Sequence, residues 1–477
     1  MVSTSTEDDY AKENYGIRSY IQCQEQLSHS LVSMRDINET LLGQVIWIRS
    51  RIHLIRNHGK RAFITLRSQT ETMTAVLSVN EDVSKSMIKF VANTTRESIV
   101  DVEGEVANTP VSTESNTQKN LELHVKKFFI VNYATFCPVF FEEDQRKSLH
   151  NIFTQYNNRV TDLRTPVPQA IFRIQAGICK LFHEILDAKG FIEIHTPKIL
   201  FAPSERNKNV FYMPYFDSKV YLAPSSQFHT QMAIAADFEK VYTIGTAFQY
   251  FGGRTRRHLT EFIGLNLEMS FQYHYHEVLD TLGDLFVQIF EELTQRFTKE
   301  MEILKLYNCK PFQYLKPTLR LEFQDAIKLL AENETGTFFN DELNVLEQEK
   351  LGQIVEAKYH TDFYILNKYP LSNQAFYTMP DPQNATLSNS YKMFMRGEEI
   401  LSGSQRIHDV YLLLERVKHH HIDTDEIRSY IEAFRYGCAP HAGAKIGLER
   451  VVMGYLGVRN IRDVSMFPRD SHHFMPS

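Results

Sequence analysis

The sequence has no long hydrophobic run, few cysteines and no large excess of charge of one sign. No stretch of about 18 apolar residues occurs in the 477 residues, so no membrane-spanning helix is expected. The five cysteines are scattered and form no CxxC pair, which argues against a disulfide framework and against a zinc site. A formal net charge of −6 does not indicate nucleic-acid binding by the chain as a whole, so such a partner would need a local basic surface.

The remaining composition is that of an ordinary globular protein. Hydrophobic residues make up 43% and charged residues 23%, and the length allows two or three domains with cores of their own. The first residues, MVSTSTEDDY, contain neither a basic segment nor an apolar run, so we expect no export signal. Together with the scattered thiols, these features predict a soluble, cytoplasmic protein.

The N-terminal part predicts a small β-barrel. Residues 1–35 are polar and of mixed charge, and we expect an N-terminal extension that is only partly ordered. Within residues 36–135, segments such as GQVIWIRSRIHLIR and RAFITLR alternate with period two, which is typical of short strands. The alternation places Phe63 and Arg67 on the outer face. Such a face suits single-stranded nucleic acid, but an ordinary solvated antiparallel face fits the pattern equally well.

The remainder predicts a hinge and a larger domain. Residues 136–165 lack a clear period and are interpreted as a hinge with one helical piece, EEDQRKSLHNIF. Residues 166–477 mix strands and helices without regular alternation, which predicts an α+β domain on an antiparallel sheet. A long amphipathic helix is expected near residues 171–186, and a helical insertion near residues 306–360.

The stretch GTAFQYFGGRTRRHLTEF, residues 245–262, predicts two strands joined by a polar loop. Its loop contains three arginines and a histidine: Arg254, Arg256, Arg257 and His258. Guanidinium groups bind phosphate oxygens in bidentate fashion, so the loop is a candidate site for a phosphate-rich ligand. Surface salt bridges would explain the same arginines equally well.

Three separated segments resemble the signature motifs of class II aminoacyl-tRNA synthetases: FIEIHTPKIL (191–200), the hairpin at 245–262 and GAKIGLERVVM (443–453). Further segments, including YNNRVTDLRT, MRGEEILSG and FPRD, closely resemble the cytosolic aspartyl-tRNA synthetases of eukaryotes. The likeness covers nearly the whole chain from about residue 11. It implies an N-terminal OB-fold that reads the anticodon of aspartate tRNA, a hinge, and a class II catalytic domain that binds ATP, magnesium and aspartate. It also implies a homodimer formed through the first motif, where Pro197 lies.

The resemblance also assigns roles to particular residues. The expected aspartate-binding residues are Ser204, Glu205, Gln227, Ser402 and Arg406. The expected ATP-binding residues are Arg257, His258, Glu399 and Arg450, of which Glu399 would also hold magnesium and both Glu399 and Arg450 would act in catalysis. The expected anticodon contacts are Phe63 and Glu122. Without the resemblance, a surface salt bridge or a core hydrogen bond would explain each of these residues.

Several positions depart from the family pattern, mainly in the expected catalytic pocket. Gln249 replaces the hairpin arginine that grips the α-phosphate, and Thr230 replaces a lysine that helps to bind the aspartate side chain. Asn266 replaces an aspartate, and Lys392 replaces a magnesium ligand, a charge reversal that would repel the metal. Further departures are Phe201, Arg206, Asn207, Pro224, Phe251, Ala444 and Lys445, with Thr74 in the barrel. The family's lysine-rich N-terminal helix has no counterpart in residues 1–35, which predicts weaker, salt-sensitive tRNA binding.

These departures predict an impaired enzyme. Losing one preorganised charge contact to a transition state costs on the order of 3 kcal/mol, or about a hundredfold in rate, and several are changed here. We therefore expect ATP-dependent aspartylation to be weak or lost. Two alternatives remain open. One is a fully active cytosolic ligase in which Arg254, Arg256 or Lys392 restores the charge. The other is a non-catalytic tRNA-binding or regulatory paralogue that pairs with itself or with an active synthetase, and neither DNA nor a membrane is expected as a partner.

Overall fold

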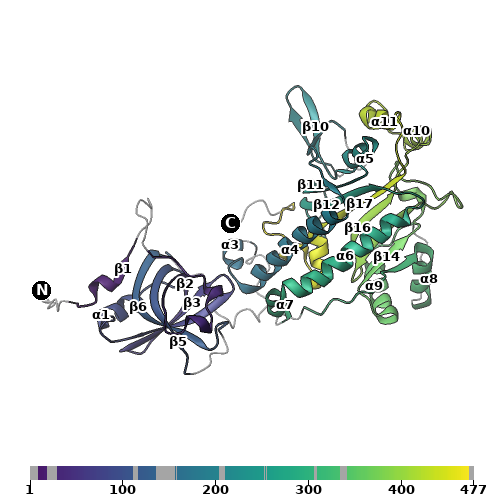
Figure 1. The fold of residues 1–477 in the computed structure, drawn as a ribbon. Helices are drawn as coiled ribbons and strands as arrows, with labels where there is room; N and C mark the ends of the chain where they lie inside the picture. The colour runs from purple at the N-terminus through teal and green to yellow at the C-terminus, as the bar shows by residue number, and fades with distance from the viewer. Residues whose placement is uncertain are drawn as a thin grey trace. The chain divides into compact units, whose positions relative to one another are not determined.

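The computed structural model describes residues 9–18, 29–110, 116–135, 156, 158–202, 210–251, 253, 255–305, 309–333 and 341–471. The chain divides into two compact units, Met1–Gln169 and Ala170–Ser477, each considered by itself (Figure 1). The helical piece expected at EEDQRKSLHNIF lies outside the described residues. No helix of the described ranges is long and apolar enough to cross a membrane.

The first unit is a small β-barrel. Its strands are β1 (Tyr15–Ile17), β2 (Val45–Asn57), β3 (Arg61–Ser68), β4 (Glu71–Ser78), β5 (Ile99–Asn108) and β6 (Leu121–Asn132). They are ordered β1-β6-β4-β3-β2-β5, and an additional pairing of β5 with β6 closes the sheet on itself. The helix α1 (Lys85–Ala92) and the 3₁₀ turns η1 (Lys12–Asn14), η2 (Met34–Asp36) and η3 (Glu39–Leu41) also belong to this unit. Alternate residues fill the interior, among them Ile48, Ile64, Leu66, Val102 and Phe128.

Two features of the barrel differ from the sequence-based expectation. Part of the expected N-terminal extension belongs to the sheet, because Tyr15 of β1 pairs in parallel with Phe128 of β6. Arg67 is 6% exposed and does not lie on an open face. Its guanidinium donates to the Glu97 carboxylate at 2.6 Å and to the Arg164 carbonyl at 2.9 Å. The end of β3 is therefore covered, which period two alone could not show.

The second unit is built on an eight-stranded sheet ordered β13-β14-β15-β16-β17-β12-β11-β7. The strands are β7 (Ile192–Glu193), β11 (Lys240–Phe248), β12 (Glu261–Ser270), β13 (Leu319–Glu322), β14 (Phe363–Asn367), β15 (Ser390–Met395), β16 (Glu398–Gln405) and β17 (His441–Gly447). All neighbours are antiparallel except β13 with β14 and β7 with β11. A three-stranded sheet of β8 (Ile199–Leu200), β10 (Ser218–Leu222) and β9 (Tyr212–Tyr215) lies outside it.

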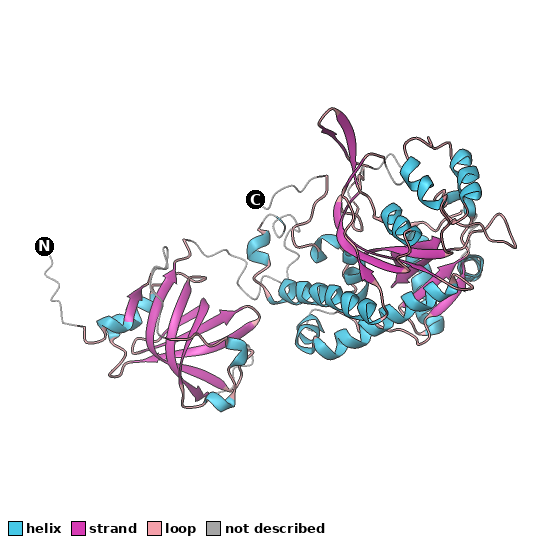
Figure 2. Ribbon diagram, turned by 45° about the horizontal axis from the view of Figure 1, so that its top comes forward, coloured by secondary structure: helices cyan, strands magenta, loops and turns pink. Residues whose placement is uncertain are grey.

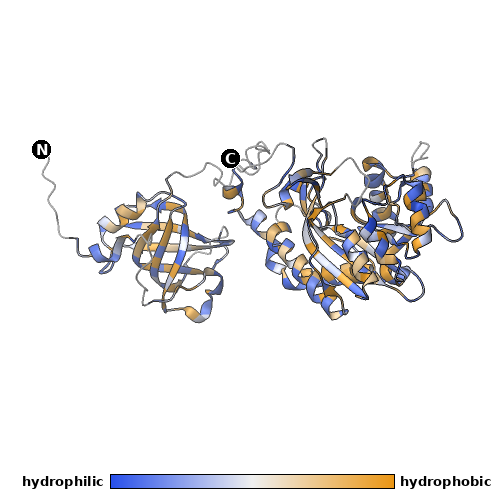
Figure 3. Ribbon diagram, turned by 90° about the horizontal axis from the view of Figure 1, so that it is seen from above, coloured by the Kyte–Doolittle hydropathy of each residue, from blue (hydrophilic) through white to orange (hydrophobic). Residues whose placement is uncertain are grey.

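The second unit also contains helices, several of which pack against the eight-stranded sheet (Figure 2). They are α4 (Pro166–Ala188), α5 (Gln227–Ala235), α6 (His276–Arg296), α7 (Thr298–Lys305), α8 (Phe323–Asn333), α9 (Val345–Tyr359), α10 (Val410–His419), α11 (Arg428–Phe434) and α12 (Leu448–Leu456); the short α3 (Arg159–Asp162) belongs to the first unit. The expected amphipathic helix is confirmed, since Ile174, Phe182 and Leu186 of α4 are fully buried. Figure 3 shows the hydrophobic residues along these helices and strands.

The expected helical insertion at 306–360 also contains a strand. Its described residues form β13 before α8 and α9, and β13 continues the main sheet beside β14. Leu319 pairs with Tyr364 at the start of this parallel ladder. The strand has only 4 residues, LRLE, so its period-two pattern is too short to be distinguished from a loop.

Candidate active site

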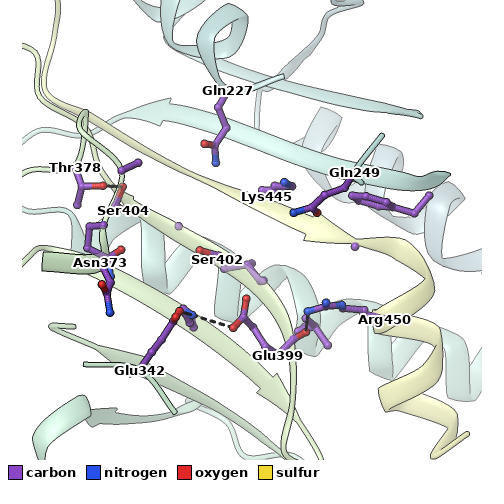
Figure 4. A pocket seen from close by; sticks show the side chains of 18 of the residues that line it. Gln227, Gln249, Glu342, Asn373, Thr378, Glu399, Ser402, Ser404, Lys445 and Arg450 are labelled. Carbon is purple, nitrogen blue, oxygen red and sulfur yellow. Dashed lines mark hydrogen bonds and ion pairs between the residues drawn. The ribbon is translucent and has the colours of Figure 1, made fainter. Parts of the chain in front are cut away.

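A cavity of about 500 Å³ lies against the main sheet of the second unit. Residues from α5, the β11–β12 hairpin, β15, β16, β17 and the start of α12 line it (Figure 4). The lining includes these expected site residues: Gln227, Arg257, His258, Glu399, Ser402, Arg406 and Arg450. The substituted residues Gln249, Phe251, Lys392 and Lys445 line the same cavity. Ser204 and Glu205 lie outside the described residues.

Strand register brings distant residues into one row across the sheet. Lys392 of β15 pairs with Ser402 of β16, Ser402 pairs with Lys445 of β17, and Lys445 pairs with Asn266 of β12. Paired residues on neighbouring strands point to the same face. Asn266 therefore shares the face of the lining residues Ser402 and Lys445, but it is 5% exposed and does not itself line the cavity. Ala444, another departure from the family pattern, alternates to the opposite face from Lys445 and is 1% exposed.

The end of the pocket assigned to the aspartate side chain contains a buried ion pair. Arg406 Nε and Nη2 donate to the two carboxylate oxygens of Glu268 at 3.0 Å and 3.2 Å. Arg406 Nη1 donates to Ser404 Oγ at 2.8 Å. Burial opposes the charge of the guanidinium, but the neighbouring Glu268 outweighs it and raises the pKa of Arg406. The Thr230 hydroxyl donates to the Gln227 carbonyl at 3.1 Å, so this position adds no charge to the neutral pair.

The expected metal ligand Glu399 is engaged by a lysine. Lys392 Nζ lies 3.0 Å from Glu399 Oε2 and 2.6 Å from Glu342 Oε1. Burial acts to lower the pKa of Lys392, but the two carboxylates outweigh it and hold the pKa above its usual value. Burial acts to raise the pKa of Glu399, but Lys392 and Arg450 outweigh it and hold that pKa below its usual value. Both groups are therefore charged at neutral pH.

These residues do not fit a divalent cation at Glu399. The ammonium of Lys392 occupies the space beside the carboxylate that a metal ligand must offer to the ion. Among the described residues, no group of three or more His, Cys, Asp or Glu side chains is placed to hold a metal.

The end of the pocket assigned to ATP retains cationic and aromatic side chains. Arg450, near the start of α12, donates through Nη1 to the Glu399 carbonyl at 3.0 Å. Arg257 pairs with Glu398 at 3.0 Å and donates to Gln348 Oε1 at 2.8 Å. The ring of His258 packs on that of Phe251 with centroids 4.1 Å apart. Burial, together with Arg450 and Arg257, lowers the pKa of His258 to about 4, so its imidazole is neutral at pH 7.

Gln249 directly follows β11, at the position of the expected anchoring arginine. Its backbone N–H donates to the Thr260 carbonyl at 2.9 Å, which closes the hairpin, and its side chain is a neutral amide. Arg256 does not replace the missing charge, because its guanidinium is paired with Glu349 and, at 3.2 Å, with Glu398. Arg256 is also not among the lining residues, and Arg254 lies outside the described part of the chain.

The two expected anticodon residues lie in the barrel. Phe63 on β3 is half-buried and meets His58 edge-on with ring centroids 5.9 Å apart. Glu122 on β6 is 7% exposed and lies 2.8 Å from His124 Nε2. Across the ladder Glu122 pairs with Thr74 of β4, whose hydroxyl accepts from Asn116 at 2.7 Å. Phe63 pairs with Val76 of β4, which pairs with His124 of β6, so the residues named for anticodon contact lie on neighbouring strands.

Sequence reasoning missed two partners in the pocket. Glu342 binds Lys392 from 50 residues away, and Tyr377 donates its hydroxyl to Gln227 Oε1 from 150 residues away. No local pattern marks either contact. Period two on β12 places Glu268 on the same face as Asn266, but it does not reveal the pairing of Glu268 with Arg406.

Comparison with known proteins agrees with this arrangement. The family model of tRNA synthetases class II (D, K and N) matches residues 151–471, and that of the OB-fold nucleic acid binding domain matches residues 46–131. The chain is similar to the human cytoplasmic aspartate–tRNA ligase, with 49% identity over 98% of this chain and 96% of that protein.

Two solved structures are also similar. One is the aspartyl tRNA synthetase from Entamoeba histolytica, with 35% identity, a TM-score of 0.87, and coverage of 99% of this chain and 97% of that chain. The other is the asparaginyl-tRNA synthetase from Pyrococcus horikoshii complexed with asparaginyl-adenylate, with 26% identity, a TM-score of 0.83, and coverage of 93% and 99%.

The chain therefore belongs to the class II tRNA synthetases of the D, K and N group. Within that group it is aspartyl-tRNA synthetase-like in sequence and in structure. The expected fold, an OB-fold barrel followed by a class II catalytic domain, is confirmed. Membership of the family implies the use of ATP and a divalent metal.

Proposed function

We propose that this protein is an aspartyl-tRNA synthetase-like protein of the cytoplasm whose activation of aspartate is weak or lost and whose barrel binds aspartate tRNA. In this family the aspartate carboxylate attacks the α-phosphate of ATP, and the tRNA then accepts the aspartyl group. The first step brings anions together, so its rate depends on cations fixed in the pocket.

The observation that carries the proposal is the lack of net positive charge at the end of the cavity expected to bind the aspartate side chain. Arg406 is matched by Glu268, and Thr230 supplies a hydroxyl where the resemblance implies a lysine. The site therefore offers a charge-neutral ion pair to the side-chain carboxylate of an amino acid that carries two carboxylates and one ammonium group. A buried carboxylate that gains no compensating cation costs several kcal/mol to desolvate, which favours weak aspartate binding.

The residues at the end of the cavity expected to bind ATP still suit a nucleotide. Arg450 and Lys445 line the cavity, and Phe251 and His258 offer a pair of packed rings. We assign ATP binding to Arg257, His258 and Arg450, with the amino acid near Gln227, Ser402 and Arg406. The same geometry disfavours a fully active ligase with a relocated arginine, because Arg256 is held by Glu349 and Glu398.

ATP–pyrophosphate exchange measured with each standard amino acid in turn tests the proposal. We expect exchange with aspartate to be at least about a hundredfold below that of the human cytoplasmic aspartate–tRNA ligase assayed in parallel, and no stimulation by the other amino acids. Exchange with aspartate at the rate of that enzyme would contradict the proposal. Robust exchange with a different amino acid would show a changed substrate instead of a weakened site.

A further inference from the structure

The ion pairs of Lys392 have the arrangement of an occupied cation site. Its ammonium lies 3.0 Å from Glu399 Oε2 and 2.6 Å from Glu342 Oε1, on side chains from a neighbouring strand and from the segment before α9. The ring of Tyr369 approaches from a third direction, with Nζ 5.3 Å from its centroid. Aromatic faces attract cations in this geometry. Two carboxylates and a ring thus hold one ammonium in place.

Burial makes this arrangement persistent. Lys392 is 9% exposed, so removing its ammonium would leave Glu399 without its nearest counter-charge inside the protein. A divalent ion entering beside Glu399 would have to displace the ammonium from the carboxylate or accept its repulsion at close range. The lysine and a metal therefore compete for the same oxygens.

A second ammonium comes from the same row of the sheet. Lys445 pairs with Ser402 on the opposite side from Lys392, and both lysines line the cavity. Strands are spaced by about 4.8 Å, so the two Cα atoms lie roughly 10 Å apart across Ser402. Arg450 lies beyond Glu399, as its hydrogen bond to the Glu399 carbonyl shows. Lys392, Lys445 and Arg450 therefore bring cations from three elements to the same cavity.

We infer that Lys392 replaces the divalent metal of this pocket, so that a polyphosphate ligand binds as the metal-free anion beside Lys392, Lys445 and Arg450. The inference rests on the proposed function for the identity of the ligand, ATP. The exclusion of the metal follows from the residues alone. The ammonium of a lysine is positively charged at neutral pH. Its charge is therefore present in the pocket at any concentration of divalent metal in solution.

Binding of Mn²⁺ alone, followed by electron paramagnetic resonance, tests the exclusion of the metal. We expect the free Mn²⁺ signal to be unchanged by wild type, and Lys392→Asp to bind one Mn²⁺ that the added change Glu399→Gln releases. Lys328→Asp is the matched control, because Lys328 is exposed on α8 and pairs with Asp325. It should bind no Mn²⁺.

Lys392→Gln is the alternative variant if Lys392→Asp fails to fold in thermal unfolding. It removes the ammonium and leaves both carboxylates, so it should also gain Mn²⁺ binding relative to wild type. Stoichiometric Mn²⁺ binding by wild type that Glu399→Gln abolishes would overturn the inference.

Calorimetric titration of ATP, in excess MgCl₂ and in EDTA, tests the form of the ligand. Wild type should bind ATP with the same affinity in both buffers, whereas Lys392→Asp should bind at least about tenfold more weakly in EDTA. A tenfold loss for wild type in EDTA would overturn the inference. If wild type binds ATP in neither buffer, the proposed nucleotide site is wrong, and the Mn²⁺ result still decides whether Lys392 excludes the metal.

Discussion

Gln249 and Thr230 are neutral at two positions of a pocket that the family uses to hold anions. The structure shows no nearby side chain in the described hairpin that restores the charge at Gln249, because Arg256 is paired with two glutamates and Arg257 with Glu398. Each missing cation removes a contact worth on the order of 3 kcal/mol in the transition state. Losses of this kind are not additive, but several in one pocket can abolish a reaction.

Phe63 is the residue on which the tRNA-binding proposal depends most directly. A ring that stacks on an anticodon base contributes about 1 to 3 kcal/mol, so Phe63→Ala should weaken binding of aspartate tRNA roughly five- to 150-fold. Filter-binding titrations at two salt concentrations measure this change. Tyr133→Ala, at an exposed ring of the same unit, should bind as wild type does. Equal affinity of wild type and Phe63→Ala would exclude an anticodon contact at this position.

At the scale of the element, β17 requires a residue without a side chain where it packs closely against β12. A Cβ atom at Gly443 would collide with the carboxylate of Glu268 and the carbonyl oxygen of Leu267. The absence of a side chain at Gly443 therefore lets Glu268 reach Arg406 across the strands. Two residues on, Lys445 projects into the cavity from the same face.

Gly443→Ala should destabilise the second unit by about 1 to 3 kcal/mol, because the new methyl group overpacks a buried ion pair. Chemical denaturation followed by circular dichroism measures the free energy of unfolding. Gly447→Ala on the same strand is the control, since its Cβ would lie 3.6 Å from Arg450 Cγ, an ordinary contact. Equal stability of the two variants would show that Glu268 can move aside.

Glu449, in the first turn of α12, makes the free energy of unfolding depend on pH. Burial raises the pKa of Glu449 from 4.5 to about 7, against hydrogen bonds from backbone N–H groups that include that of Ile263. The folded state therefore keeps a proton that the unfolded state has lost between these two values. Stability from this group is full below about pH 4.5 and is lost as the pH rises towards 7, by on the order of 3 kcal/mol.

Comparing wild type with Glu449→Gln isolates this contribution. Urea unfolding between pH 5 and 8 should show wild type losing stability relative to the variant as the pH rises, with the difference levelling off above about pH 7. Cys179, whose thiol pKa is raised to about 11 by burial and by Glu449, stays neutral throughout this range. A difference that does not change with pH would mean that Glu449 is ionised in the folded state.

At the scale of the whole molecule, the sequence predicts secondary-structure elements that depend on neighbouring residues better than contacts between distant segments. The pattern at residues 245–262 predicted the hairpin that β11 and β12 form, and helical spacing located α4 because Ile174 and Leu186 repeat on one buried face. The resemblance located most of the pocket residues. Contacts between distant segments could not be predicted this way, since Glu342 meets Lys392 and Glu349 meets Arg256 only through the folding of the insertion. Arg67 was misplaced for the same reason, because Glu97 and Arg164 cover it from elsewhere in the chain.

The assembly of the molecule is a further prediction. Residues around the first motif expose apolar side chains, with Ile192, Ile199 and Phe201 at 50%, 38% and 74%. Exposed apolar surface of this kind is typical of a subunit interface, so we expect a homodimer. Size-exclusion chromatography with light scattering should give twice the chain mass of 55.6 kDa at micromolar concentration. A mass of one chain would contradict the prediction.

Aspartate-dependent ATP–pyrophosphate exchange by wild type and by the triple variant Gln249→Arg, Thr230→Lys, Lys392→Asp tests the central claim most directly. The claim is that lost cations and a displaced metal, on an intact synthetase fold, limit the reaction. Restoring both should raise exchange by well over about a hundredfold from a low starting rate. Equal rates for the two proteins, whether both high or both negligible, would contradict it.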